Sequence, residues 1–275
     1  MPNTVIIESA EGAALAERLA SAAVCVAPDG QKPCGQCPHC KKAKASTHPD
    51  IAQIRGSGAS GAIKVEAARD LRADAYIQPN DSDRKVYIIH WAQGSTEQAA
   101  NALLKLLEEP PAYAVFILVC ASAASLLPTV RSRGVLISDY AGDTSGQSAK
   151  YRKKAAEIAL AIAAGDGYVC LKCLKALEKD RAGYKETLSA LCTNFSAALR
   201  LWAGIEPGVP SDIKKTEKDA LEPETVNQLK SKYSASKLTG MIAAAQTARH
   251  SLDRNASGPL TTVLLVNELA PYRHQ

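Results

Sequence analysis

Short apolar segments alternate with amphipathic helical segments over the first 140 residues, and this alternation constrains the fold more than any other feature. The apolar segments have the β-branched composition of buried parallel strands, and the segments between them carry apolar residues at helical spacing. Such an order predicts the α/β class with a parallel, doubly wound sheet. The expected strands are 3–8, 47–54, 85–90, 115–120 and 135–138, and the expected helices are 13–24, 63–75, 98–109 and a short one from 126.

Four cysteines lie within sixteen residues at the end of the first predicted helix. Cys25, Cys34, Cys37 and Cys40 have the spacing Cys-x8-Cys-x2-Cys-x2-Cys, which lets a tight loop containing Gly and Pro wrap around one ion. Four thiolates with no open position are the ligands of a structural zinc site, and soft sulfur ligands disfavour calcium and magnesium. The spacing therefore predicts one structural zinc ion held by these four residues.

Other interpretations of the cysteines stay open. His39 could serve as the fourth ligand, although Cys25 completes a uniform set of thiolates. The four residues could instead be reduced surface thiols, or a pair of them could form a disulfide. The N-terminal sequence lacks a basic region followed by a long apolar core, so we expect no signal peptide and a reducing compartment. The eight cysteines of the chain then favour metal binding over disulfides.

The composition argues against a membrane protein and leaves nucleic-acid binding open. Apolar segments such as 115–120 are too short to span a bilayer, so we expect a cytoplasmic protein without membrane contact. The net charge of +5 permits contact with nucleic acid or an acidic partner but requires neither. Beyond residue 140 the sequence is helical in character, apart from a polar linker expected at 142–150 and a loop expected at 206–223.

The segment from Lys85 to Gly134 resembles the clamp-loader branch of the AAA+ ATPases. The match is carried by the strand KVYIIH, the run AANALLKLLEEPP, the strand FILVC and the run LLPTVRSRG. The four cysteines, followed by the run THPD at 47–50, resemble the zinc module of the bacterial members, which are the gamma/tau and delta-prime subunits of DNA polymerase III. The resemblance covers residues 3–138 and implies an AAA+ sheet with an inserted zinc module.

The residues that would bind nucleotide in this family are degenerate here. A phosphate loop needs the pattern G-x-x-x-x-G-K-[ST], whereas the turn after the first strand contains Glu8, Ser9 and Gly12 but no lysine. His90 and Trp91 occupy the positions of the two carboxylates that bind magnesium and polarise water in this family. The γ-phosphate sensor and the lid arginine are replaced as well. The resemblance therefore implies a polymerase III subunit without ATP binding or ATPase activity of its own, similar to the delta-prime subunits.

Ser132 and Arg133 match the Ser-Arg-Cys motif of the family, in which the arginine reaches the ATP of the neighbouring subunit. The resemblance implies the same trans arginine finger for Arg133, because a fixed guanidinium neutralises charge that develops on a phosphoryl group. Gly134 stands where the motif has cysteine, and we interpret that position as packing. An ordinary surface arginine that caps a helix is the alternative interpretation.

The resemblance also implies a domain order and a set of partners. Residues 1–140 would form the AAA+ domain with its zinc module at 25–40, residues 141–182 a helical lid, and residues 183–275 a helical collar. The partners would be gamma/tau and delta subunits and, through that complex, the sliding clamp and primed DNA. The chain would act as a rigid stator. Two other functions stay open: a diverged gamma/tau-like ATPase, and a zinc-module nucleic-acid-binding protein outside replication.

Overall fold

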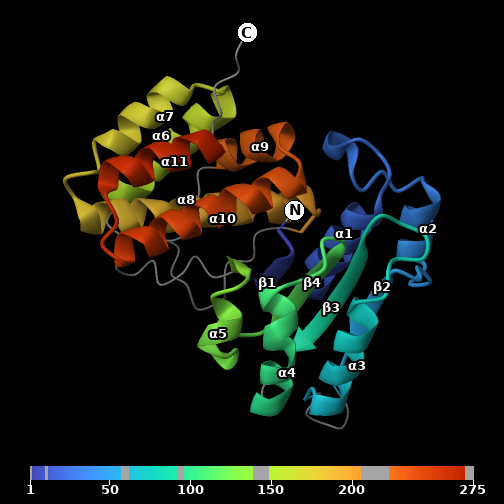
Figure 1. The fold of residues 1–275 in the computed structure, drawn as a ribbon. Coiled ribbons are helices and arrows are strands. Elements are labelled where there is room, and N and C mark those ends of the chain that lie inside the picture. Colours follow the sequence, from blue (N-terminus) through green and yellow to red (C-terminus); the bar gives the residue numbers. More distant parts are fainter. Residues whose placement is uncertain are drawn as a thin grey trace. The chain divides into compact units, whose positions relative to one another are not determined.

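The computed structural model describes residues 2–9, 12–56, 62–91, 96–138, 149–205 and 223–269. The chain divides into two compact units, Met1–Ile137 and Ser138–Gln275. The first unit is the α/β part, coloured blue to green in Figure 1. Its strands are β1 (Thr4–Glu8), β2 (Ile51–Ile54), β3 (Lys85–Trp91), β4 (Ala114–Cys120) and β5 (Val135–Ser138), and its α-helices are α1 (Gly12–Val24), α2 (Pro38–Lys44), α3 (Val65–Ala75), α4 (Glu97–Glu108) and α5 (Pro128–Arg131).

The five strands form one sheet in the order β2-β3-β4-β1-β5. The pairs β1 and β4, β3 and β4, and β2 and β3 are parallel. Helix α1 packs against one face of the sheet, where it contacts β3 and β4, while α3 and α4 pack together on the other face (Figure 1). Because both faces are covered, β4 is buried along its whole length. The predicted α/β class with a parallel sheet is confirmed.

Three local features differ from the sequence-based expectations. The second strand begins only at Ile51, because the residues before it form a turn in which the Ile51 N–H donates to the His48 carbonyl at 3.2 Å. Helix α2 lies within the cysteine region, where no helix is expected; Cys37 caps it and Pro38 occupies its first turn. The short helix α5 begins at Pro128, slightly later than expected, again with proline in the first turn.

The second unit is helical throughout its described part. Helix α8 contacts α6, α9 and α10, so it is the central helix of this unit. The division of this unit into a lid and a collar stays a prediction, and the linker expected at 142–150 and the loop expected at 206–223 fall almost wholly outside the described residues. The helices are α6 (Ala149–Ala164), α7 (Gly167–Lys175), α8 (Arg181–Trp202), α9 (Pro223–Lys232), α10 (Ala235–Asp253) and α11 (Gly258–Leu269).

Among the described helices, none is both long and apolar enough to cross a membrane.

Candidate metal centre and arginine site

The four predicted metal ligands come together at the end of α1. The sulfur atoms of Cys25, Cys34, Cys37 and Cys40 all lie within 4.8 Å of one another, and Cys25 Sγ is 3.7 Å from Cys34 Sγ and 3.9 Å from Cys37 Sγ. Sulfur atoms bound tetrahedrally at about 2.3 Å to one zinc ion lie about 3.8 Å apart. A disulfide would bring two of them to about 2.05 Å, and all four are free thiols. The geometry therefore fits a metal site, and none of the four cysteines is in a disulfide in this structure.

Backbone N–H groups of the cysteine loop point at the sulfur atoms. Cys25 Sγ accepts from the N–H groups of Ala27 and Cys34, each at 3.5 Å. Cys34 Sγ accepts from the Cys37 N–H at 3.3 Å, and Cys37 Sγ accepts from the Cys40 N–H at 3.4 Å. These bonds stabilise sulfur in its anionic form, which is the form that binds metal. The last of them also caps the N-terminus of α2, so helix and ligand loop depend on each other.

The loop shifts the pKa values of two of its thiols in opposite directions. The N–H groups of Cys37 and Gln36 lower the pKa of Cys34 to about 6, so this residue is ready as a thiolate. Burial raises the pKa of Cys40 to about 12, and Cys40 is only 2 % exposed. A bound cation would offset the cost of ionising this buried thiol. Four thiolates are soft ligands that suit zinc, so the residues present fit the predicted ion.

His39 does not compete for the metal position, because it takes part in a separate hydrogen-bonded chain. Its Nδ1 lies 3.0 Å from Nε2 of His48, and Nδ1 of His48 accepts from the Asp50 N–H at 3.0 Å. His48 therefore carries its proton on Nε2 and donates to His39. Burial keeps the pKa of His48 below its usual range, which favours this neutral tautomer. This series of hydrogen bonds connects α2 to the turn before β2.

Asp50 extends this series of hydrogen bonds into the sheet. Its buried carboxylate accepts from the N–H groups of Asn80, Asp81 and Ser82, the latter two at 2.8 Å. Its carbonyl accepts from the Val86 N–H at 2.8 Å, in β3. Asp50 thus joins the metal region, β2 and the turn before β3. The run THPD was assigned to the second strand and to the zinc-module resemblance, so this role of Asp50 was not predicted; a carboxylate directly before an apolar strand segment was the available signal.

The end of β1 stays bound to β4 and to the turn at Ala123, where a phosphate loop would leave the sheet. Glu8 Oε1 accepts the Ala123 N–H at 2.7 Å, and the Ser9 N–H donates to the Cys120 carbonyl at 3.0 Å. β1 therefore keeps its pairing with β4 at the point where a phosphate loop would leave the sheet. Ser9 is buried, and Glu8 places a negative charge there. Residues 10–11 of this turn are outside the described part.

Gly12 begins α1 in close contact with the sheet. A Cβ at this position would lie 2.9 Å from Ile7 Cγ2 and 3.0 Å from Val119 Cγ1. Both neighbours belong to buried strands, so a larger residue would displace the core. The glycine is therefore explained by close packing of α1 on β1 and β4, without a nucleotide.

The two residues at the end of β3 provide no carboxylate. His90 is half-buried, its Nε2 has no hydrogen-bond partner among the described residues, and burial, together with Arg55, lowers its pKa, so the ring is neutral. Trp91 is 5 % exposed and packs in the core on the α3 and α4 side. Burial raises the pKa of the neighbouring Cys120 thiol to about 11. These neutral groups cannot bind magnesium as a carboxylate does.

Arg133 lies at the surface of the first unit. Its guanidinium donates to the Thr129 carbonyl at 2.5 Å through Nη1 and forms an ion pair with Glu108 at the end of α4. Ser132 is exposed, and its hydroxyl donates to the same carbonyl at 3.1 Å. The guanidinium thus binds a carbonyl of α5, while the Arg133 side chain stays 31 % exposed. The ion pair with Glu108 was not foreseen, since 25 residues separate the partners.

Close packing explains why Gly134 stands where the Ser-Arg-Cys motif has cysteine. A Cβ on Gly134 would lie 2.7 Å from two atoms of Ile6, which is fully buried in β1. Glycine is therefore required for close packing between the Arg133 turn and the sheet.

The known proteins that resemble this chain are subunits of DNA polymerase III. The family profile described as DNA polymerase III, delta subunit, matches residues 1–138. A DNA polymerase III subunit delta' of Yersinia pestis is 40 % identical over 110 residues, covering 40 % of this chain and 32 % of the relative. That of Haemophilus influenzae is 41 % identical over 115 residues, covering 42 % and 35 %. The chain thus matches about a third of the length of these curated relatives.

Other relatives are more distant. A DNA polymerase III subunit gamma/tau of Mycobacterium tuberculosis is 35 % identical over 103 residues, covering 37 % of this chain and 17 % of the relative. A gamma subunit-related protein of Thermotoga maritima has a solved structure with a TM-score of 0.34 and 19 % identity, covering 96 % of this chain and 93 % of the other. Since the family profile spans half of the sequence, the chain belongs to the DNA polymerase III, delta subunit family.

Proposed function

We propose that this chain is a delta' subunit of a bacterial clamp loader and that Arg133 completes the ATP site of a neighbouring subunit. Membership of the family and the delta' relatives support the first part. The observation that carries the second part is the exposed guanidinium of Arg133, held at the surface by Thr129 and Glu108. A guanidinium fixed in this way can neutralise charge on a phosphoryl group without first losing conformational freedom.

The chain acts as a stator because it has no nucleotide to respond to. Glu8 puts a carboxylate at the turn where phosphate would bind, and His90 and Trp91 provide no magnesium ligand. A ligand changes a conformational equilibrium only by binding two states unequally. Without a bound nucleotide, this chain keeps one conformation while its neighbours cycle.

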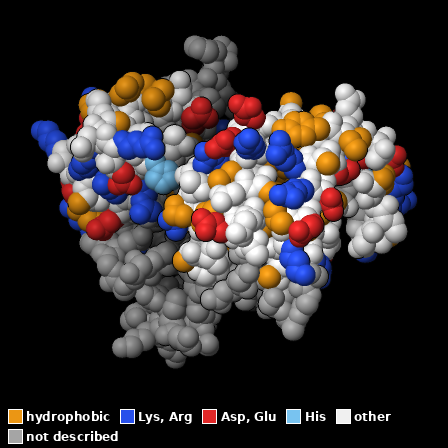
Figure 2. All heavy atoms as spheres, turned by 60° about the horizontal axis from the view of Figure 1, so that its bottom comes forward, with side chains coloured by type: hydrophobic (Ala, Val, Ile, Leu, Met, Phe, Trp, Pro, Cys, Tyr) orange, Lys and Arg blue, Asp and Glu red, His pale blue; other side chains and the backbone are white. Residues whose placement is uncertain are grey.

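The partners of this function are gamma/tau and delta subunits, and the complex places the sliding clamp on primed DNA. A zinc ion bound by Cys25, Cys34, Cys37 and Cys40 stabilises the cysteine loop. Direct binding of DNA by the chain alone is less well supported. Among the described residues on the face drawn in Figure 2, basic and acidic side chains are intermixed, whereas DNA-binding proteins typically gather their basic side chains in a stripe.

The decisive experiment is a clamp loader reconstituted with this chain, in which ATPase activity stimulated by clamp and primed DNA is compared for wild type and Arg133→Ala. Trans fingers contribute about 10³–10⁵ in rate, so the site next to this chain should lose most of its turnover. Arg131→Ala is the matched control, since Arg131 is also exposed and lies two residues away. Gel filtration must show intact complexes.

An intact complex whose rate is unchanged by Arg133→Ala would remove the finger and leave a scaffold. Failure of the wild-type chain to join the complex would remove the clamp-loader assignment itself. Titration of the isolated chain with a fluorescent ATP analogue tests the stator role: saturable binding would favour a gamma/tau-like ATPase instead.

A further inference from the structure

Strand β2 is the outermost strand on its side of the sheet. The Val86 N–H donates to the Asp50 carbonyl, so Asp50 and the residues two and four positions later direct their peptide groups toward β3. The peptide group of Gln53 therefore points away from the sheet. No other strand in the described part of the chain pairs with this edge. An outer edge with outward N–H and C=O groups can accept an additional strand.

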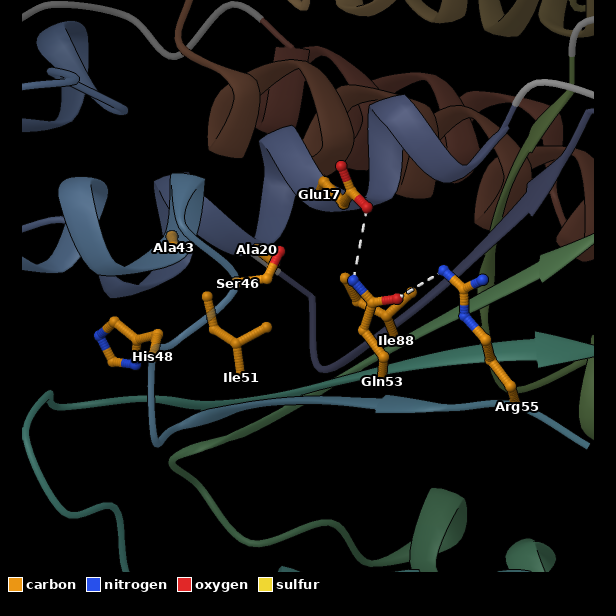
Figure 3. Close-up of a pocket in the computed structure, with 9 residues that line it drawn as sticks. All are labelled: Glu17, Ala20, Ala43, Ser46, His48, Ile51, Gln53, Arg55 and Ile88. Atoms are coloured by element: carbon orange, nitrogen blue, oxygen red, sulfur yellow. Dashed lines mark hydrogen bonds between the residues drawn. The ribbon is translucent and has the colours of Figure 1, made fainter.

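A pocket of about 370 Å³ lies beside this edge on the α1 face. In Figure 3, Gln53 and Arg55 rise from β2 toward Glu17 of α1, while His48 lies at the opposite end of the pocket. Arg55 Nη2 donates to Gln53 Oε1 at 2.8 Å, and Gln53 Nε2 donates to Glu17 Oε1 at 3.4 Å. These polar groups satisfy one another at the rim. The apolar part of the lining comes from Ala20, Ala43, Ile51 and Ile88.

A second pocket of about 370 Å³ lies beside the same strand on the α3 face. Its lining includes the apolar residues Ile54 and Leu71 and the acidic residues Asp70 and Asp74 of α3. Arg55 also lines it, but the side chain of Arg55 rises toward α1 in Figure 3. Asp74 is already engaged, since its two oxygens accept from Lys85 at 2.9 Å and from the Tyr87 hydroxyl at 2.8 Å. Asp70 is exposed and forms no ion pair within the described residues. This pocket therefore fits a side chain with an aliphatic stem and a positive end.

We propose that the edge of β2 binds an extended, basic peptide segment of a partner protein, which adds to the sheet as a further strand. Successive side chains of a strand point to opposite faces, so adjacent peptide residues would enter the two pockets. An apolar side chain would enter the α1-face pocket, and a lysine or arginine would enter the α3-face pocket beside Asp70. Backbone bonds to Gln53 give affinity, and the pockets give specificity. The proposal goes beyond the clamp-loader function and does not depend on Arg133.

The test uses the full chain and a fluorescein-labelled peptide of alternating valine and lysine, with binding followed by anisotropy. Three controls define the mode. A valine–glutamate peptide reverses the charge, a backbone N-methylated valine–lysine peptide cannot form the strand, and Glu66→Gln removes an exposed carboxylate of α3 that does not line the pocket.

The valine–lysine peptide should bind saturably, and Asp70→Asn should weaken it by about two- to five-fold, as expected for a surface charge pair. Glu66→Gln should leave binding unchanged. Gln53→Pro removes the outward N–H and should weaken binding roughly ten-fold, the value of one or two backbone hydrogen bonds. Thermal unfolding shows whether this variant folds; if it does not, loss of binding by the N-methylated peptide tests the same hydrogen bonds.

Three results would overturn the proposal: equal binding of the valine–glutamate peptide, equal binding of the N-methylated peptide, or no saturable binding of the valine–lysine peptide. Sedimentation of the chain alone tests whether a second copy of this chain occupies the edge. Concentration-dependent dimers that disappear in Gln53→Pro would assign the edge to a second copy of this chain instead.

Discussion

Arg133 and Glu108 form an ion pair that joins the turn after α5 to the end of α4. The two residues come from separate runs of the sequence, RSRG and LLEEPP, and are 25 positions apart. Their side chains are 31 % and 44 % exposed, so the pair contributes little to stability. Its main effect is on geometry, because the Glu108 carboxylate fixes the orientation of the Arg133 guanidinium at the surface.

Glu108 is therefore predicted to position Arg133 for its neighbour's ATP. Glu108→Gln should lower kcat of the reconstituted, stimulated ATPase several-fold with KM nearly unchanged, because the finger loses its orientation and ATP binding is not affected. Glu108→Asp should restore part of the rate. Glu109→Gln is the control, since Glu109 is the adjacent exposed carboxylate. Equal rates for both glutamine variants, in a loader whose rate is lowered by Arg133→Ala, would show that Arg133 needs no such support.

Metal binding by the cysteine cluster can be tested by elemental analysis. Cys37→Ser should abolish bound zinc, because it removes a ligand and also the sulfur that caps α2. A strong chelator should lower Tm of the wild type toward that of the variant, and magnesium should not restore it. Cys173→Ser provides the control, since Cys173 lies in α7 outside the cluster. The site would be contradicted if the wild-type chain is purified without metal and added zinc does not raise its Tm.

Asp50 is predicted to be the most sensitive polar residue of the first unit. Asp50→Asn leaves the N–H groups of Asn80, Asp81 and Ser82 facing a buried amide with fewer acceptor sites. The free energy of unfolding should fall by about 2–4 kcal/mol, as expected for lost hydrogen bonds to a buried charge. Asp83→Asn is the control, because Asp83 lies just beyond the same turn. Urea denaturation at neutral pH measures both variants, and equal stabilities would refute the role of Asp50.

The same residue predicts a pH dependence. Burial alone would raise the pKa of Asp50, but the N–H groups of Asn80, Asp81 and Ser82 together outweigh it and lower the pKa. A carboxyl whose folded pKa is depressed stabilises the protein above its unfolded pKa, near 3.9, and this contribution is lost as the pH falls further. The stability difference between wild type and Asp50→Asn should therefore shrink below about pH 4. Acid also releases the metal from both proteins, so only their difference is informative.

Gly134 is predicted to resist replacement by the cysteine of the family motif. Gly134→Cys should lower the free energy of unfolding by about 1–3 kcal/mol, because overpacking against a buried residue forces the core to move. The residue that the new side chain would contact, Ile6, is fully buried. Gly30→Ala is the control, since nothing lies within 4 Å of a Cβ there. An unchanged Tm for Gly134→Cys, measured by scanning calorimetry, would mean that β1 adapts freely.

The features that depend on short-range sequence patterns could be predicted from the sequence alone. Strand β5 has the predicted bounds, and β1, β3 and β4 differ from them by one residue. Periodicity and β-branched composition depend only on near neighbours in the chain, so they survive whatever the tertiary packing. The cysteine cluster was accessible for the same reason, because three of its ligands occupy one tight loop.

Tertiary structure decided the relationships between distant segments. The pairing of Arg133 with Glu108 and the capture of the turn at 80–82 by Asp50 join groups that are far apart in the sequence. The two pockets beside β2 depend on where α1 and α3 lie relative to the strand. Such contacts form only when packing brings the segments together, and no local periodicity encodes which polar groups then meet. The sequence could therefore indicate the fold and the metal ligands, whereas the partners of Arg133 and Asp50 and the open edge of β2 required the folded chain.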